Sequence, residues 1–130
     1  MSNLLQDKVA VVTGANRGIG KCITETFAEN GASIIACMRV ISPETDDWMK
    51  NLESKFNISI NPVMVDLSNE KSVKGSIKEI MSISKRIDVL VNNAGIASGA
   101  LFQMTPISEL RKIFEINFFR IYIRFKCCII

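Results

Sequence analysis

Residues 13–20, T-G-A-N-R-G-I-G, combine three glycines with polar and basic groups at a spacing suited to holding a phosphate. Gly14 would let the chain turn sharply out of a strand, and Gly18 would let the backbone approach the phosphate. Gly20 would allow the next helix to pack closely on the sheet, and that helix would offer free N–H groups. The alternative is a plain tight turn. We predict nucleotide contacts from Gly14, Asn16, Arg17, Gly18, Ile19 and Gly20.

Three later groups of polar residues stand where an α/β fold places functional side chains. Asp66-Leu67 and Asn92-Asn93-Ala94-Gly95 each follow an apolar run, and Asn117 lies in a segment with helical periodicity. Taken singly, each has an ordinary explanation: a helix-initiating acid, a turn and a solvated helix residue. Taken in order behind the glycine loop, they favour a functional interpretation.

Short apolar runs alternate with helix-like segments along the chain, which predicts parallel strands joined by right-handed crossovers. Continuous apolar strands imply helices on both faces of the sheet. We therefore predict an α/β fold, a doubly wound, Rossmann-like parallel sheet truncated after about four strands, the fourth an open apolar edge. The expected strands are residues 8–13, 33–38, 60–65 and 88–92. The expected helices are residues 19–30 and 42–56, a third capped by Ser68, and a fourth that opens at Thr105-Pro106 and includes Asn117.

Two motifs, the glycine spacing G-x-x-x-G-x-G behind a threonine and N-N-A-G after the fourth expected strand, occur together in a known protein family. In these motifs the chain resembles the short-chain dehydrogenase/reductase family over about residues 6 to 119. The resemblance implies that Asp66, with Leu67, holds an adenine ring and that Asn117 is the active-site asparagine. It also implies cofactor contacts from Asn93, Ala94 and Gly95.

The end of the second expected strand bears on the choice of cofactor. An NAD site usually has Asp or Glu there, bonded to the ribose 2′-hydroxyl. By alignment with the family, that position is Met38, which cannot make this bond, and Arg39 follows it. With Arg17 in the glycine loop, two guanidinium groups could bracket a 2′-phosphate. We expect NADP rather than NAD, the alternative for either arginine being a solvated surface charge.

The family's remaining catalytic residues are a Ser and a Tyr-x-x-x-Lys pair, in which the tyrosine is the general acid or base. Tyr122 and Lys126 have the mutual spacing of that pair. Tyr122 comes only five residues after Asn117, however, which leaves no room for a fifth strand and its serine. We interpret the pair as a coincidence and expect the catalytic set to be incomplete.

The composition changes at Arg120, because residues 120–130 contain no Asp, Glu, Gly or Ser. We divide the chain into a dinucleotide-binding half-domain, residues 1–119, and an atypical tail, residues 120–130. Our hypothesis is a reading-frame break or truncation near residue 119 of a longer gene. The alternative is a loose prenylation motif in the final C-C-I-I.

Three kinds of function follow from these features. The intact relative would be an NADP-dependent oxidoreductase that moves hydride between nicotinamide and a small-molecule carbonyl or alcohol. The loop style is most similar to 3-oxoacyl-[acyl-carrier-protein] reductases, and this chain would be a catalytically incomplete form. The alternatives are a non-enzymatic nucleotide-binding fragment and a module that inserts into an intact relative. The family is usually homo-oligomeric, but we expect its oligomer helices beyond this chain.

Charge and composition argue against several other classes. The net charge of +3 is mild and the basic residues are scattered before the tail, so we expect no nucleic-acid partner. The chain has no His and its four Cys form no C-x-x-C pair, so we expect no metal and a reducing environment. Residues 1–7 lack signal-peptide features and no apolar run has membrane-span length, so we expect a cytoplasmic protein without a membrane partner.

Overall fold

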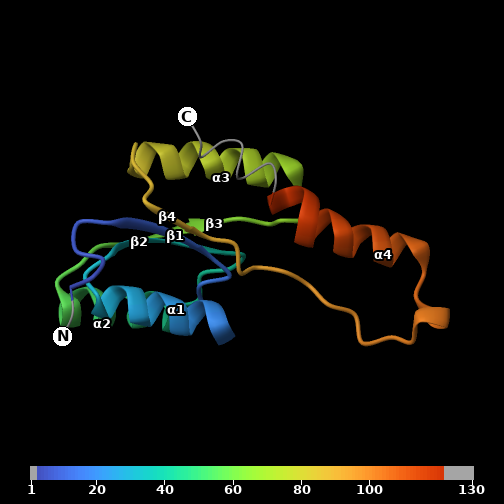
Figure 1. Cartoon of the computed structure of the whole chain (residues 1–130), viewed down its shortest axis with the longest axis horizontal. Coiled ribbons are helices and arrows are strands. Elements are labelled where there is room, and N and C mark those ends of the chain that lie inside the picture. Colours follow the sequence, from blue (N-terminus) through green and yellow to red (C-terminus); the bar gives the residue numbers. More distant parts are fainter. Residues whose placement is uncertain (1–2, 122–130) are drawn as a thin grey trace.

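A four-stranded parallel sheet forms the centre of the computed structural model, which describes residues 3–121 (Figure 1). The strand order is β3-β2-β1-β4, so the fourth strand lies at one edge. The prediction of a Rossmann-like parallel sheet with the fourth strand at its edge is confirmed. The strands are β1 (Val9–Thr13), β2 (Ser33–Met38), β3 (Ile60–Met64) and β4 (Val89–Val91).

Helices cover both faces of this sheet, as continuous apolar strands require. Figure 1 shows α1 and α2 on one face and α3 on the other, with α4 standing out beyond the carboxyl ends of the strands. The helices are α1 (Gly18–Glu29), α2 (Pro43–Phe56), α3 (Glu70–Ile83) and α4 (Ile107–Phe114), with a 3₁₀ turn η1 (Phe102–Met104) and a π-helical turn η2 (Glu115–Phe119).

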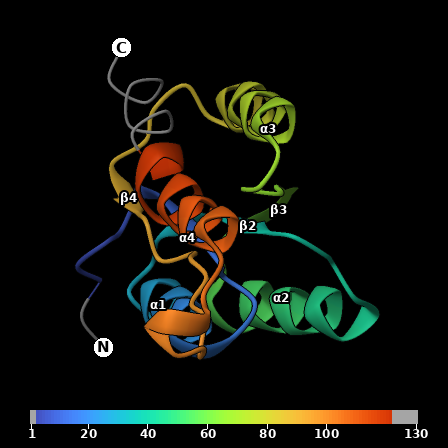
Figure 2. The same ribbon diagram turned by 90° about the vertical axis from the view of Figure 1, so that its right-hand side faces the viewer.

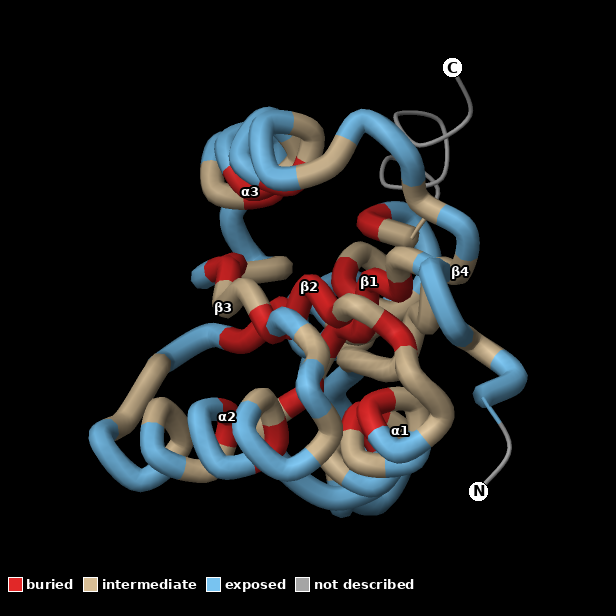
Figure 3. The backbone as a smooth tube through the Cα atoms, turned by 90° about the vertical axis from the view of Figure 1, so that its left-hand side faces the viewer, coloured by how far each residue is buried: buried red, intermediate tan, exposed pale blue. Residues whose placement is uncertain are grey.

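The core divides into two apolar clusters because successive strand residues point to opposite faces. Val12 and Ile34 belong to the cluster under α1 and α2, whereas Val11 and Ile35 belong to the cluster under α3. All four of these side chains are buried, and Figure 3 shows buried residues concentrated along the sheet and the inward sides of the helices. Burial on both faces explains why the strands read as continuous apolar runs.

The predicted start of α2 is confirmed and that of α3 is wrong by one residue. Pro43 is the first residue of α2, and the Oγ atom of Ser42 accepts a hydrogen bond from the Thr45 backbone N–H. The cap of α3 is Asn69, whose side chain accepts from two backbone N–H groups of the first turn, and not Ser68. The Ser68 hydroxyl donates instead to Asp66, because that carboxylate offers a charged acceptor two residues away.

Candidate functional site

The candidate residues gather at the carboxyl edge of the sheet because the four strands run parallel and end at nearly the same level. Thr13 lies opposite Cys37, Met38 opposite Met64, and Val12 opposite Val91. The loops that follow the strands therefore emerge side by side, in the order set by β3-β2-β1-β4. Ligands of doubly wound sheets bind at such an edge, where the strand order reverses.

The glycine loop makes a tight turn that is fastened to the end of β2. The backbone N–H groups of Gly14 and Ala15 both donate to the Cys37 carbonyl, at 2.9 and 3.2 Å. Gly14 has a φ of +67°, in the left-handed region that favours glycine. A Cβ atom on Gly20 would overlap the Gly14 carbonyl and the Asn93 side chain. A side chain at residue 20 is thus excluded by the glycine loop and by Asn93. We predicted that Gly20 allows the helix to pack closely on the sheet, and the contact with the loop is a further reason for glycine at this position.

The N-terminus of α1 is open on the side where a phosphate would bind. Arg17 is its N-cap residue, with extended backbone and no capping hydrogen bond from its side chain. Gly18 has a φ of +53°, and a Cβ there would meet nothing within 4 Å. Arg17, Gly18 and Ile19 are all exposed, and Asn16 is half-buried. Uncapped first-turn N–H groups beside open space suit an anionic ligand.

A hydrogen-bonded clamp joins this loop to the end of β4. The Thr13 hydroxyl donates to the Val91 carbonyl at 3.2 Å and accepts from the backbone N–H groups of Asn93 and Ala94, at 3.1 and 3.0 Å. The Asn93 side-chain amide donates to the Thr13 carbonyl at 3.1 Å and to the Gly14 carbonyl at 3.4 Å. The structure therefore brings Gly14, Gly20, Asn93 and Ala94 together, with Thr13 as the residue that holds them.

Asp66 is oriented by its own loop at the end of β3. One carboxylate oxygen accepts from the Ser68 hydroxyl at 2.6 Å and from the Ser68 backbone N–H at 2.9 Å. These bonds, with smaller contributions from the charges of Arg39 and Lys112, hold the pKa of Asp66 below its ordinary value. Asp66 is thus kept as an anion in a fixed orientation, while Leu67 packs against the cluster under α3.

Asn117 lies in the π-helical turn η2 and not in the α-helix that we predicted there, since α4 ends at Phe114. Its Oδ1 accepts from the Ile96 backbone N–H at 2.8 Å, and its Nδ2 donates to the Ile96 carbonyl at 2.7 Å. A Cβ on Gly95 would come within 3.0 Å of the same Oδ1. Asn117 is therefore bonded to the loop after Gly95 and is not a solvated helix residue.

The end of β2 offers no carboxylate. Met38 is 2% exposed and packs in the core, while Arg39, the next residue, is exposed. After the two hydrogen bonds from Ser68, the charge of Arg39 makes a smaller contribution to the lowered pKa of Asp66. Arg39 and Arg17 thus occupy separate loops at the same edge of the sheet.

Two residues that organise the candidate site, Thr13 and Ser68, were not predicted as site residues from the sequence. The Thr13 hydroxyl serves three partners, and its only signal was the threonine that precedes the first motif glycine. Ser68 orients Asp66, for which the D-x-S spacing was an available sign. The pair Tyr122 and Lys126 and the rest of the tail beyond residue 121 lie outside the described residues.

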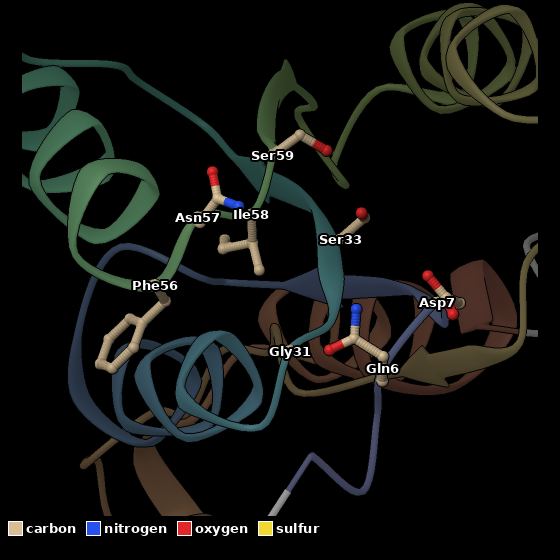
Figure 4. Close-up of a pocket in the computed structure, with 8 residues that line it drawn as sticks. All are labelled: Gln6, Asp7, Gly31, Ser33, Phe56, Asn57, Ile58 and Ser59. Carbon is tan, nitrogen blue, oxygen red and sulfur yellow. The ribbon is translucent and has the colours of Figure 1, made fainter. Parts of the chain in front are cut away.

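Other features of residues 3–121 do not compete with this site. A hollow of about 470 Å³ opens at the opposite, amino edge of the sheet, between Gln6, Asp7, Asn57 and Ser59 (Figure 4). None of the predicted residues lines it. No helix in the described part is both long and apolar enough to cross a membrane. The same residues hold no group of three or more His, Cys, Asp or Glu that could bind a metal ion.

The parallel sheet, the glycine loop at the start of α1 and the switch in strand order between β1 and β4 define a doubly wound, Rossmann-like protein. The pattern of the short chain dehydrogenase family matches residues 8–128. The chain belongs to that family, as the motif resemblance implied.

Among the relatives, an uncharacterized oxidoreductase of Thermotoga maritima is 32% identical over 125 residues, which are 96% of this chain and 48% of that protein. The 3-oxoacyl-[acyl-carrier-protein] reductase FabG of Aquifex aeolicus is 31% identical over 113 residues, 87% of this chain and 45% of that protein. The chain therefore spans about half the length of these relatives.

The solved structure of L-sorbose reductase from Gluconobacter frateurii, complexed with NADPH and L-sorbose, is similar to this fold. It has a TM-score of 0.89 and 27% identity over 98% of this chain and 48% of that one. The NADP active-site complex of RhlG from Pseudomonas aeruginosa has a TM-score of 0.80 and 31% identity over 98% of this chain and 47% of that one.

Proposed function

We propose that the carboxyl edge of the sheet binds NADP(H), in preference to NAD(H). The observation that carries this proposal is the end of β2, where Met38 is buried in the core and exposed Arg39 follows. A carboxylate at that place would bond the two ribose hydroxyls of NAD and repel a 2′-phosphate. A guanidinium group favours the phosphate through charge-assisted hydrogen bonds. Arg17 supplies a second guanidinium from the neighbouring loop.

The remaining groups of the site suit the rest of a dinucleotide. The uncapped N-terminus of α1 and the open space at Gly18 fit a pyrophosphate. Asp66, held as an anion by Ser68, fits an adenine amino group, with Leu67 beside it. The segment from Asn93 to Gly95 and Asn117 would face the nicotinamide end. These roles rest on position in the fold and on family membership.

The proposed chemistry is that of an oxidoreductase acting on a small-molecule carbonyl or alcohol. Bound NADPH would supply the hydride, and the protein would supply position and a proton. A relative supports the same reaction class: the NADPH-dependent 3-dehydrocapnine reductase of Ornithobacterium rhinotracheale is 35% identical over 114 residues. Within this class we propose a 3-oxoacyl thioester as the substrate, on the similarity to 3-oxoacyl-[acyl-carrier-protein] reductases.

Turnover needs a proton donor as well as a cofactor. Tyr122 is the only tyrosine of the sequence, and it comes only five residues after Asn117, far fewer than the family's spacing. We therefore expect the 130-residue chain to bind NADPH without oxidising it in the presence of a 3-oxoacyl thioester. Activity that disappears in Tyr122→Phe would contradict this expectation and restore the Tyr122–Lys126 pair as a catalytic dyad.

Isothermal titration calorimetry tests the cofactor choice. The chain should bind NADPH at least about tenfold more tightly than NADH, because a hydrogen bond to a charged group contributes about 1.5–3 kcal/mol and about 1.4 kcal/mol is tenfold in affinity. The double variant Arg17→Ala/Arg39→Ala should lose most of that preference while NADH affinity changes little. A matched control removes two charges elsewhere, through Lys78→Ala/Lys85→Ala, and should keep the preference. Equal affinities in the unaltered chain, or a preference for NADH, would refute the proposal.

A further inference from the structure

Arg120 is a buried cation at the end of the turn that holds Asn117. It is the C-cap residue of η2 and is only 7% exposed. Burying a guanidinium group is unfavourable unless carboxylates compensate its charge. Among the described residues two carboxylates do so, Glu115 and Glu70, which come from different elements.

The first partner lies on the same turn. The Arg120 Nη2 atom is 3.2 Å from the Glu115 carboxylate, and the Arg120 backbone N–H donates to the Glu115 carbonyl. The two residues are five positions apart, the spacing at which a π-helix makes its hydrogen bonds. Side chain and backbone thus close the same five-residue turn, and Asn117 lies within it.

The second partner fastens this turn to another part of the fold. The Arg120 Nη1 atom is 3.6 Å from the carboxylate of Glu70, the first residue of α3. Because α3 packs on the sheet through Val73 and Ile80, the backbone of Glu70 is held in place, while its side chain is 51% exposed. Glu70 also pairs with Lys74, at 2.7 Å, one turn further along the same helix.

The other elements near this turn provide little alternative anchorage. None of the residues of α4 is buried, and Ile116 is the only buried apolar residue of η2. Within residues 3–121, the contacts that orient the turn are therefore the burial of Ile116, the two bonds from Asn117 to Ile96, and the ion pairs of Arg120.

We propose that Arg120 is a positioning residue: by linking Glu115 to Glu70 it holds the π turn so that the Asn117 amide meets the Ile96 backbone. The Asn117 side chain then keeps the loop after Gly95 in place. The importance of this for a nicotinamide cofactor rests on the proposed function, but the coupling from Glu70 to Ile96 is a property of the chain alone.

Amide hydrogen exchange, followed by NMR on the 130-residue chain without cofactor, tests the coupling. The reporter is the Ile96 amide, which donates to Asn117. Arg120→Ala should accelerate its exchange about tenfold and Glu70→Gln about threefold, with the amide of Ile35 in β2 unchanged. Arg120→Lys, which keeps the charge but not the forked geometry, should fall between the unaltered chain and Arg120→Ala.

Two control variants separate this effect from general loss of charge. Lys74→Ala removes the other partner of Glu70, and Arg111→Ala removes an exposed arginine of α4; both should leave the Ile96 rate unchanged. An unchanged Ile96 rate in both Arg120→Ala and Glu70→Gln would overturn the proposal. So would equal acceleration at Ile96 and Ile35, which would show a purely global effect. Because no cofactor is present, failure of NADPH binding would not alter either outcome.

Discussion

The sheet with its three covering helices, residues 9–92, and the segment that follows it, residues 96–121, are stabilised in different ways. Of the buried apolar residues in the described part of the chain, all lie in the first region except Ile116. The second region exposes large apolar side chains, among them Phe102 at 87%, Phe114 at 56% and Phe118 at 66%. Its Arg120 pairs with Glu70 of the first region, whereas the two bonds from Asn117 to Ile96 lie within the second region.

This difference bears on how the site is organised. The groups proposed for the pyrophosphate and adenine lie on loops tied directly to buried strands, such as the Thr13–Asn93 clamp. Of the groups proposed for the nicotinamide end, Asn93 and Ala94 share this clamp, whereas Asn117 lies in residues 96–121, where Ile116 and Arg120 are the only buried residues. The nucleotide half of the site should therefore be preorganised, and the reactive half should be more easily displaced.

Truncation of apolar side chains in the two regions should give the largest contrast. Ile35→Ala, in β2, should lower the free energy of unfolding by about 2–5 kcal/mol, because it leaves a cavity in a buried cluster. Phe114→Ala, on exposed α4, should change it by less than about 0.5 kcal/mol. Urea denaturation followed by the fluorescence of Trp48, which packs against the core, measures both. Similar losses in the two variants would mean that the regions do not differ in this way.

Glycine replacements should give the next largest contrast. Gly20→Ala should cost about 1–3 kcal/mol or more, since its Cβ would overlap the Gly14 carbonyl, which belongs to a constrained loop. Gly99→Ala, in the second region, is the matched control, because a Cβ there meets nothing within 4 Å. It should be neutral in the same denaturation assay. A neutral Gly20→Ala would show that the loop can move away from the helix.

The sequence was sufficient to predict those elements whose local residue pattern reflects how they are buried or capped. The strands around Val11 and Ile35 were predictable because strands buried on both faces are continuous apolar runs, and the start of α2 because Ser42-Pro43 is a strong local signal. The edge strands were the least certain at their ends: β4 was expected over residues 88–92 and covers only Val89–Val91.

The remainder depended on contacts between residues distant in the chain. The π turn around Asn117 is held by contacts with Ile96 and Glu70. Both residues are distant in the sequence, so the helical periodicity around Asn117 gives no sign of these contacts. The burial of Arg120 likewise depends on the Glu70 carboxylate of α3, which is distant in the sequence. From the sequence alone, Arg120 was therefore assigned to the basic tail. At the start of α3, Ser68 and Asn69 are both good caps, and the competing bond from Ser68 to Asp66 decided between them.

Acid should produce a smaller effect, which Asp88 in the first region illustrates. The Asp88 carboxylate accepts from the Val9 backbone N–H at 2.8 Å, and this bond, followed by the charge of Arg86, holds its pKa below 3.8. A lowered pKa contributes stability that is present above pH 3.8 and is lost as the pH falls through the lower, folded-state value. Denaturation curves should therefore show declining stability below that pH. Asp88→Asn should flatten the decline, whereas Asp47→Asn, on the exposed side of α2, should not.

Titration of the ¹⁵N-labelled chain with NADPH, followed by NMR, tests most directly whether the carboxyl edge binds a dinucleotide. We expect the largest chemical-shift changes at Gly18, Arg39 and Asp66, which follow β1, β2 and β3 at that edge. Figure 2 views the molecule from the side on which α4 stands, with α4 in front of the sheet. The amides of Asn57 and Ser59, at the hollow of the opposite edge, should not move. Shifts that centre on Asn57 and Ser59 while the glycine loop stays unchanged would contradict the assignment of this site.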